Sequence, residues 1–201
     1  MHEFWLFVSA LGNSKWLLPA ACILVLCAGE DRWRIGLRWF SGLAIVCAVT
    51  LASKLAFMGW GVGSRALDFT GFSGHAAVSS AVYPVALSLL AGSRWRWVGA
   101  AAGVTLALLI AYSRLPLHAH SVSEVIAGLT LGLMGSLWYF GRTLEAVRAK
   151  FMACAVAVAL SVTASHMVAP GVGTHDLVMK LAQSMSGREV LYNRAWLHRA
   201  G

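Results

Sequence analysis

The sequence predicts an all-α membrane protein, a polytopic helical bundle of about six transmembrane helices. Hydrophobic residues make up 59% of the 201 residues, charged residues make up only 12%, and the mean hydropathy is +0.71. This composition is too apolar for a water-soluble domain. Because a transmembrane helix needs about 20 apolar residues, the chain has room for about five or six of them, joined by short connections.

The first three predicted spans each end at a polar or glycine-rich break. The apolar run 14–29 ends at the charged segment 30–34, and the run 36–60 ends at a glycine-rich turn. The third run, 72–91, ends before the basic and aromatic segment 94–97. Charged residues and tryptophans gather where a helix leaves the hydrocarbon core, so these breaks are predicted helix ends.

The last three predicted spans follow the same pattern. The run 97–113 ends at the polar connection 114–120, and the run 121–141 ends at the basic connection 142–150. The sixth run, 151–168, is predominantly apolar and contains a single histidine, His166. Each run is close to the roughly 20 residues that a spanning helix needs.

Two segments outside these spans have their own predicted structure. The apolar run 4–12 is followed by polar residues, and we expect it to be an interfacial helix lying against the membrane. The segment 174–186 is predicted to form a short amphipathic helix before a basic end. We therefore divide the chain into an integral-membrane bundle, 1–169, and a polar basic tail, 170–201.

The positive charge of the chain predicts its orientation. The formal net charge is +8, but the Lys and Arg residues are spread between hydrophobic runs, which favours contact with membrane lipids and argues against nucleic acid as a partner. The first, third and fifth connections and their flanks hold Arg32, Arg34, Arg38, Arg94, Arg96, Arg142, Arg148 and Lys150. The opposite short connections hold Lys15, Lys54, Arg65 and Arg114. The first set is expected in the cytoplasm.

Five ionisable residues are predicted to meet at the other face of the membrane. Lys54, His75, Arg114, His120 and Glu124 all lie near the outer ends of predicted spans. An ionisable residue at a membrane segment is costly to place and marks a functional site by default. Two imidazoles, a carboxylate and two cations at one depth suit an anion whose apolar part stays in lipid, such as the phosphate of a phosphorylated lipid.

These residues resemble the motifs of the type 2 phosphatidic acid phosphatase (PAP2) superfamily, which includes vanadium haloperoxidases and bacterial undecaprenyl-diphosphate phosphatases. The family's second motif, Ser-Gly-His, is matched by Ser73-Gly74-His75. Its third motif is Ser-Arg, with His six residues after the Arg and Asp four residues after that His. Ser113-Arg114, His120 and Glu124 match this motif at the same spacing, with Glu in place of Asp.

The first motif, a Lys followed by Arg-Pro, is only partly present. Lys54 lies upstream as the motif requires, but the position seven residues later is Gly61 and no Arg-Pro follows. Arg65, eleven residues after Lys54, is the candidate substitute. It would reach a phosphate from a loop that contains Gly59, Gly61 and Gly63.

The resemblance implies a membrane lipid phosphatase of the bacterial cytoplasmic (inner) membrane, with no cofactor and no metal, whose active site faces the periplasm or exterior. The substrate would be a phosphorylated lipid, either an isoprenoid (undecaprenyl) diphosphate or a glycerophospholipid phosphate. The resemblance also implies a phosphohistidine intermediate at His120. His75 would protonate the leaving oxygen and later activate water.

The residue types support this chemistry on their own. Phosphoryl transfer requires positioning and neutralisation of the equatorial oxygens, which Lys54, Arg114 and Arg65 can provide. Ser73 and the backbone at Gly74 are predicted at a helix start, where free N–H groups favour an anion. On a helix, His120 and Glu124 share a face, so the carboxylate can bind one ring nitrogen and leave the other as nucleophile.

Several of these residues also have simpler explanations. Ser121-x-x-Glu124 has the spacing of a capping box, so Glu124 can complete a helix start. Lys54 can be a snorkelling anchor, and Arg65 can be a loop charge paired with Asp68. His118 has no motif position and is expected to be a loop residue.

Two other functions fit parts of the pattern. One is a metal-dependent membrane hydrolase with His118, His120 and Glu124 as ligands, which Arg114 and Lys54 disfavour because they would repel a divalent cation. The other is a non-catalytic lipid-binding protein that keeps the fold, suggested by the missing Arg-Pro and by the Glu substitution. A phosphotransferase that passes the phosphoryl group to an acceptor other than water is a variant of the phosphatase.

Overall fold

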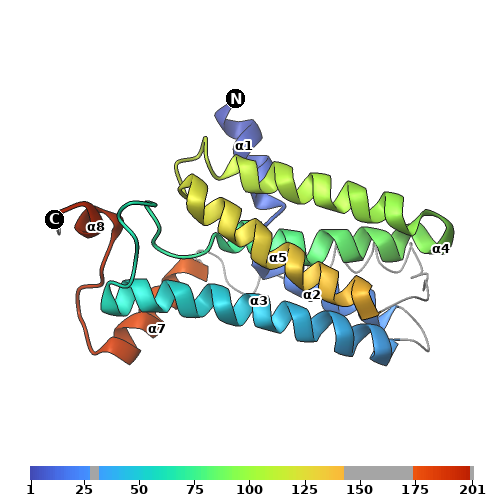
Figure 1. Ribbon diagram of the computed structural model, residues 1–201, viewed down its shortest axis with the longest axis horizontal. Helices are drawn as coiled ribbons and strands as arrows, with labels where there is room; N and C mark the ends of the chain where they lie inside the picture. Colours follow the sequence, from blue (N-terminus) through green and yellow to red (C-terminus); the bar gives the residue numbers. More distant parts are fainter. Residues whose placement is uncertain (28–31, 143–173, 200–201) are drawn as a thin grey trace.

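A computed structural model describes residues 1–27, 32–142 and 174–199, and the regular elements in these ranges are all α helices. They are α1 (His2–Ala10), α2 (Ser14–Leu26), α3 (Arg32–Trp60), α4 (Gly74–Ser113), α5 (Val122–Arg142), α7 (Thr174–Ser186) and α8 (Arg194–Arg199). Four stretches are long and apolar enough to cross a membrane: His2–Leu26, Trp33–Trp60, Gly74–Ser113 and Val122–Gly141. This confirms the predicted all-α membrane bundle, whose long helices lie side by side (Figure 1).

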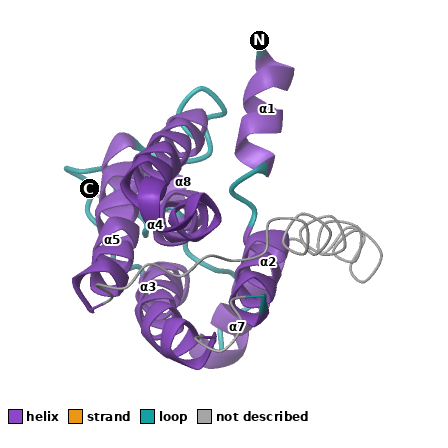
Figure 2. Cartoon of the chain, turned by 90° about the vertical axis from the view of Figure 1, so that its right-hand side faces the viewer, coloured by secondary structure: helices purple, strands orange, loops and turns teal. Residues whose placement is uncertain are grey.

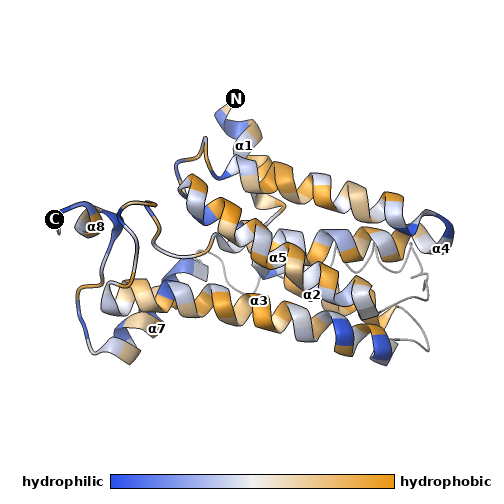
Figure 3. Cartoon of the chain, viewed as in Figure 1, coloured by the Kyte–Doolittle hydropathy of each residue, from blue (hydrophilic) through white to orange (hydrophobic). Residues whose placement is uncertain are grey.

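Helix α3 shows how the bundle meets lipid. Only 33% of its most apolar window is buried within the protein, and Leu37, Ile45 and Leu51 are exposed. Figure 3 shows hydrophobic residues along the length of α3 and hydrophilic residues at the end where it begins. The exposed apolar side chains of a membrane helix face acyl chains, so this pattern fits a lipid-facing span. The helix begins at Arg32, four residues before the predicted start.

Helix α4 contains both the third and the fourth predicted span. Its backbone leaves the helical conformation at Gly92, where φ is 73° and ψ is −175°, and the chain reverses direction there (Figure 1). The turn was expected at 94–97, but those residues are helical. Glycine permits this positive φ at no steric cost, so a single residue makes the turn. The two halves pack closely, because a Cβ on Gly99 would lie 2.3 Å from the carbonyl oxygen of Leu87.

Helix α5 packs tightly on the first half of α4. A Cβ on Gly132 would lie 2.0 Å from Ser80 Oγ, and a Cβ on Gly128 would lie 2.7 Å from the carbonyl oxygen of Ser73. Ser136 Oγ also donates a hydrogen bond to the carbonyl oxygen of Ser80. Small residues let membrane helices approach closely and gain van der Waals contact. This approach brings the start of α5 against the start of α4.

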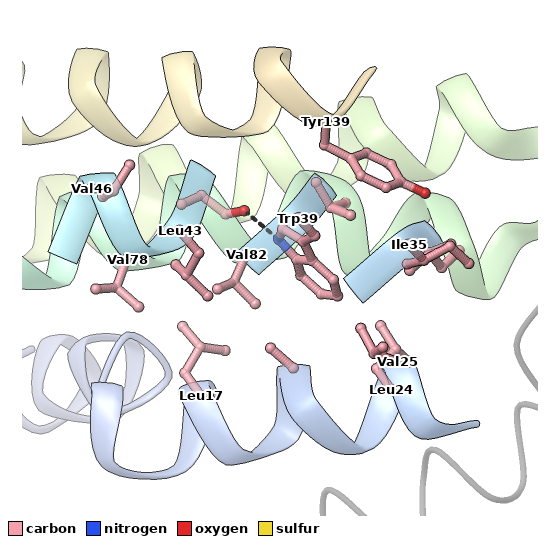
Figure 4. Packing of buried hydrophobic residues seen from close by; sticks show 14 of the residues in the cluster. Leu17, Leu24, Val25, Ile35, Trp39, Leu43, Val46, Val78, Val82 and Tyr139 are labelled. Carbon is pink, nitrogen blue, oxygen red and sulfur yellow. Dashed lines mark hydrogen bonds between the residues drawn. The ribbon is translucent and has the colours of Figure 1, made fainter. Parts of the chain in front are cut away.

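The core between α2, α3, α4 and α5 holds these elements in register (Figure 4). Its buried side chains include Leu17, Leu24, Val25, Ile35, Trp39, Leu43, Val46, Val78, Val82 and Tyr139. Trp39 is fully buried, and its indole Nε1 donates a hydrogen bond of 3.1 Å to the carbonyl oxygen of Ala81. A buried indole N–H without a partner would be costly, so this bond fixes α3 against α4.

The N-terminal region differs from the prediction of a surface helix followed by a span over 14–29. Helices α1 and α2 together form one candidate span, and α1 packs against α4 rather than lying apart. Asn13 caps α2 by accepting a hydrogen bond of 3.0 Å from the Lys15 backbone N–H. A Cβ on Gly12 would lie 3.2 Å from the His75 ring. The α1–α2 turn therefore covers one side of that imidazole.

The tail forms the predicted amphipathic helix as α7, followed by the short α8. Helix α7 packs against α3 (Figures 1 and 2), and α8 lies beside the loop 61–73 that follows α3 (Figure 1). Ala182 of α7 and Leu197 of α8 are buried. The sixth predicted span, 151–168, and the predicted domain boundary at 169 lie outside the described residues.

Candidate active site

Four ends of three helices converge at one end of the bundle. The end of α3, both ends of the α4 hairpin and the start of α5 meet there (Figure 1). This arrangement brings together the ionisable residues that the sequence predicted on one face. The loop 61–73 between α3 and α4 completes this end, and the tail helix α8 lies beside it.

The Ser73-Gly74-His75 motif begins α4 and is fastened on two sides. The Phe72 backbone N–H donates a hydrogen bond of 3.1 Å to Ser53 Oγ on α3. The Ser73 backbone N–H donates one of 3.1 Å to the carbonyl oxygen of Glu124 on α5. Gly71 has φ +142°, and a Cβ there would lie 3.2–3.3 Å from Lys54 atoms. The loop is thus pressed against Lys54, which sets the start of α4 beside that cation.

His120 and Glu124 form a hydrogen-bonded pair at the start of α5. His120 Nδ1 lies 2.7 Å from Glu124 Oε2, and Glu124 is fully buried. An ionised carboxylate accepts hydrogen bonds only, so it favours the tautomer with the proton on Nδ1. The lone pair of Nε2 is then available to attack an electrophile.

The Glu124 carboxylate also organises its surroundings. Oε1 accepts hydrogen bonds from the Thr70 backbone N–H, at 2.7 Å, and from the Thr70 hydroxyl. Oε2 accepts one of 3.2 Å from the Ser121 backbone N–H, while Ser121 Oγ accepts from the Glu124 backbone N–H. This reciprocal pair is the capping box that the spacing indicated. Glu124 therefore both completes the helix start and orients His120.

Three further side chains surround this pair. Lys54, Arg114 and His120 all lie within electrostatic range of His75, and Lys54 is also within range of Glu124. Arg114 Nη1 donates a hydrogen bond to Ser9 Oγ on α1. The structure thus brings together Lys54, His75, Arg114, His120 and Glu124, with two cations beside two imidazoles.

Three buried donors at this end have no hydrogen-bond partner among the described residues: Thr50 Oγ1, Ser73 Oγ and Arg114 Nε. An unsatisfied buried donor costs free energy, so each such group calls for an explanation. Ser73 belongs to the Ser-Gly-His motif and Arg114 to the Ser-Arg motif, and both groups can donate to a phosphoryl oxygen.

Burial and the neighbouring cations shift the titration of His120. Burial lowers the pKa of the His120 imidazole, and the charges of Lys54 and Arg114 lower this pKa further. The hydrogen bond to Glu124 acts in the opposite direction, but the net pKa lies below the ordinary histidine value. His120 is therefore neutral at pH 7, as a nucleophile must be.

The tail contributes a residue that sequence reasoning did not select. Arg194 Nη2 lies 2.7 Å from Glu124 Oε2, and Arg194 Nη1 forms an ion pair with Asp68. His198 Nε2 lies 2.9 Å from the other Asp68 oxygen. In the sequence, Arg194 is one of three arginines in the basic end, and no local pattern distinguishes it. The missing motif arginine is the one signal that called for another guanidinium.

Two candidate residues from the sequence are not part of this cluster. The Arg65 side chain is exposed on the loop between α3 and α4. Asp68, its expected partner, instead binds Arg194 and His198 with its carboxylate. His118 is also exposed, at a positive φ of 50°. Arg65 therefore reaches the cluster only if the loop rearranges.

The proposed metal ligands are not grouped as a metal site. Within the described ranges, no three His, Cys, Asp or Glu side chains lie together in a way that could hold an ion. The Glu124 carboxylate already binds His120, Thr70 and Arg194. The trio of His118, His120 and Glu124 would have to rearrange to share an ion.

Comparison with known proteins identifies the family. The model of the PAP2 superfamily matches residues 5–148. The chain belongs to the PAP2 superfamily. This match covers every residue of the cluster except those from the tail.

One curated relative is similar over nearly its whole length. It is an uncharacterized 22.5 kDa protein in the cps region of Klebsiella pneumoniae, 40% identical over 207 residues that cover 97% of this chain and 98% of the relative. No solved structure matches the chain. Membership of the PAP2 superfamily supports a phosphatase-type activity for this membrane protein.

Proposed function

We propose that this PAP2 protein is a membrane lipid phosphatase that hydrolyses a phosphomonoester or diphosphate on a lipid carrier through a phosphohistidine at His120. The observation that carries the proposal is the 2.7 Å contact of His120 Nδ1 with the buried Glu124 carboxylate, beside Lys54 and Arg114. This is a nucleophile, an orienting group and a cationic clamp in one place.

In the first step, His120 Nε2 attacks the phosphorus atom. The N–P bond forms as the bond between phosphorus and the leaving oxygen breaks, and His75 donates a proton to that oxygen. Lys54 and Arg114 neutralise charge on the equatorial oxygens. Glu124 holds the proton on His120 Nδ1 and stabilises the positive charge that develops on the ring.

In the second step, water hydrolyses the phosphohistidine. Neutral His75 takes a proton from the water molecule as its oxygen attacks phosphorus, and the N–P bond breaks. Inorganic phosphate leaves, His120 regains its free Nε2, and His75 is protonated for the next cycle. Ser73 Oγ and Arg114 Nε, which have no other partner among the described residues, would donate hydrogen bonds to phosphoryl oxygens in both steps.

The setting of the site favours a lipid substrate. The cluster lies at the ends of candidate spans whose outer surfaces are apolar, so an acyl or isoprenoid chain can remain in the bilayer while its phosphate reaches His120. An isoprenoid diphosphate or a glycerophospholipid phosphate meets this requirement. The basic residues at the opposite end of the bundle support a site that faces the periplasm or exterior of the bacterial inner membrane.

Phosphate release from purified protein in detergent tests the proposal. The substrates are undecaprenyl diphosphate, phosphatidylglycerophosphate and phosphatidic acid, each with and without EDTA and vanadate. We expect turnover of at least one lipid, retained in EDTA and inhibited by vanadate, which mimics the five-coordinate transition state. Loss of turnover in EDTA would favour the metal-dependent hydrolase, and no turnover of any lipid would favour the non-catalytic protein.

A pair of histidine variants locates the intermediate. His120→Ala should lower kcat by at least about a thousandfold and remove the acid-labile phosphoenzyme trapped from labelled substrate. His118 is exposed and lies two residues away, so His118→Ala should retain both the kcat and the phosphoenzyme of the unaltered protein. Phosphoenzyme at the normal level in His120→Ala would overturn the assignment.

A further inference from the structure

Arg194 joins the C-terminal tail to the proposed active site. Its Nη2 binds Glu124 Oε2 at 2.7 Å, while its Nη1 binds the Asp68 carboxylate and, at 3.3 Å, the Asp68 carbonyl oxygen. The guanidinium therefore bridges the loop 61–73 and helix α5. A planar fork with several N–H donors suits such a bridge better than an ammonium group does.

The tail is docked at this place by contacts of its own. The Tyr192 backbone N–H donates a hydrogen bond of 2.9 Å to the carbonyl oxygen of Met58 on α3. The Trp196 ring lies against Gly61, where a Cβ would be 3.0 Å from it. Asn193 caps α8 by accepting a hydrogen bond of 2.9 Å from the Trp196 backbone N–H. These contacts hold the backbone beside Arg194 independently of its side chain.

Glu124 Oε2 is shared by Arg194 and His120. Both nitrogen atoms lie 2.7 Å from that oxygen, so the guanidinium and the imidazole are close neighbours. The third motif of the family has Asp where this chain has Glu124. The extra methylene of Glu124 adds a rotatable bond, so the carboxylate needs further contacts to keep one orientation. Thr70 holds one carboxylate oxygen and Arg194 holds the other.

We infer that Arg194 is a positioning residue of the phosphatase reaction: it fixes the Glu124 carboxylate against His120, which makes the C-terminal tail part of the active site. The inference rests on the proposed function. Arg194 supplies a guanidinium to the site of a chain whose first motif lacks its arginine and whose Arg65 is exposed.

Steady-state kinetics with matched arginine variants test this role. Arg194→Gln should lower kcat at least tenfold with less than a threefold change in KM, because Glu124 and not the substrate loses its partner. Arg199→Gln removes an exposed arginine from the same helix and should retain the unaltered kcat. Equal kcat values for the two variants would overturn the inference.

The titration of His120 provides a readout that does not need turnover. The charged and titratable groups around it are Glu124, Lys54, Arg114, His75, Arg194 and Asp68, with His198 on Asp68. Without the positive charge of Arg194, the Glu124 carboxylate stabilises protonated His120 more strongly. The pKa of His120 should therefore rise by about one unit. NMR of histidine-labelled protein in detergent measures it, with the signal assigned by its loss in His120→Ala.

Arg194→Lys separates charge from geometry. Lysine keeps the positive charge but cannot bridge both carboxylates, so the His120 pKa should stay near its original value while kcat recovers only in part. If the His120 pKa in Arg194→Gln equals that of the unaltered protein, Arg194 does not act on the Glu124–His120 pair and the tail has only a structural role. If the unaltered protein turns over no lipid, the proposed function fails, and the NMR titration still decides whether Arg194 acts on the Glu124–His120 pair.

Discussion

Glu124 lies in the first turn of α5, and its Oε2 lies 2.7 Å from Nδ1 of His120, which precedes the helix. The capping box at Ser121 brings the two side chains together, because it turns the Glu124 carboxylate back toward the residues before α5. The same carboxylate accepts from the Ser121 and Thr70 backbones, so the orientation of the imidazole depends on how α5 begins and on the loop before α4. The helix start and the proposed catalytic pair are one hydrogen-bonded unit.

Glu124→Asp tests whether this unit depends on the length of the side chain. The substitution installs the family's residue, but the shorter carboxylate loses its reach to Thr70 and Arg194. Because a displacement of about 1 Å can cost about a hundredfold, we expect kcat to fall by about tenfold to a hundredfold. Glu3→Asp, the same change at an exposed position, is the control. Unchanged or higher kcat in Glu124→Asp would mean that these extra contacts contribute nothing.

The pH dependence of turnover should report the titration of His120. Only neutral His120 can attack, so kcat/KM falls as the pH drops through the pKa of this imidazole, which burial holds below the ordinary histidine value of 6.5. Lys54→Met removes a charge that lowers this pKa. The acid limb of log kcat/KM should therefore move to higher pH by roughly half a unit to one unit. Lys180→Met, at an exposed position on α7, should not move the limb, and an unmoved limb in Lys54→Met would contradict the assignment.

Features determined by local sequence were predicted well. Apolar runs bounded by charges predicted helices α3 and α5 within a few residues, and the alternation of the spans placed His75, Arg114 and His120 at one end of the bundle. Hydropathy and helical periodicity are properties of short windows, so they can be read without the fold. The capping box at Ser121 is likewise determined by local sequence, and its spacing predicted it.

Features determined by contacts between distant segments were not predicted. The reversal of α4 was expected at 94–97 because charged residues usually mark a loop, but Gly92 makes the turn alone. Arg194 was read as one charge of a basic end, since its partners Glu124 and Asp68 are far away in the sequence. No local periodicity records such a contact, and only packing of the tail on α3 selects one arginine from several.

Arg65→Ala distinguishes the two candidate replacements for the motif arginine. If the loop folded inward around an anion, as the sequence suggested for Arg65, the loss of this phosphate contact should lower turnover at least about tenfold. The exposed position of Arg65 and the engagement of Asp68 by Arg194 lead us to expect less than about a threefold loss, because an exposed charge contributes little. Asp68→Ala should lower kcat more than Arg65→Ala, since it frees one side of the Arg194 bridge. A tenfold loss in Arg65→Ala, with normal folding, would restore the loop arginine to the phosphate site.

The orientation of the bundle can be measured with introduced cysteines. Ala119→Cys lies in the exposed connection beside the site, and Ser93→Cys lies in the exposed turn of α4 at the opposite end. In a background with Cys22, Cys27, Cys47 and Cys154 replaced by serine, a membrane-impermeant thiol reagent should label Ala119→Cys in intact cells but not Ser93→Cys. Permeabilised cells should show labelling of both variants, which controls for accessibility. This expectation follows from the basic residues near the Ser93 end, because short connections rich in Lys and Arg favour the cytoplasmic side. The reverse pattern would place the site, and the phosphate of its lipid, on the cytoplasmic side.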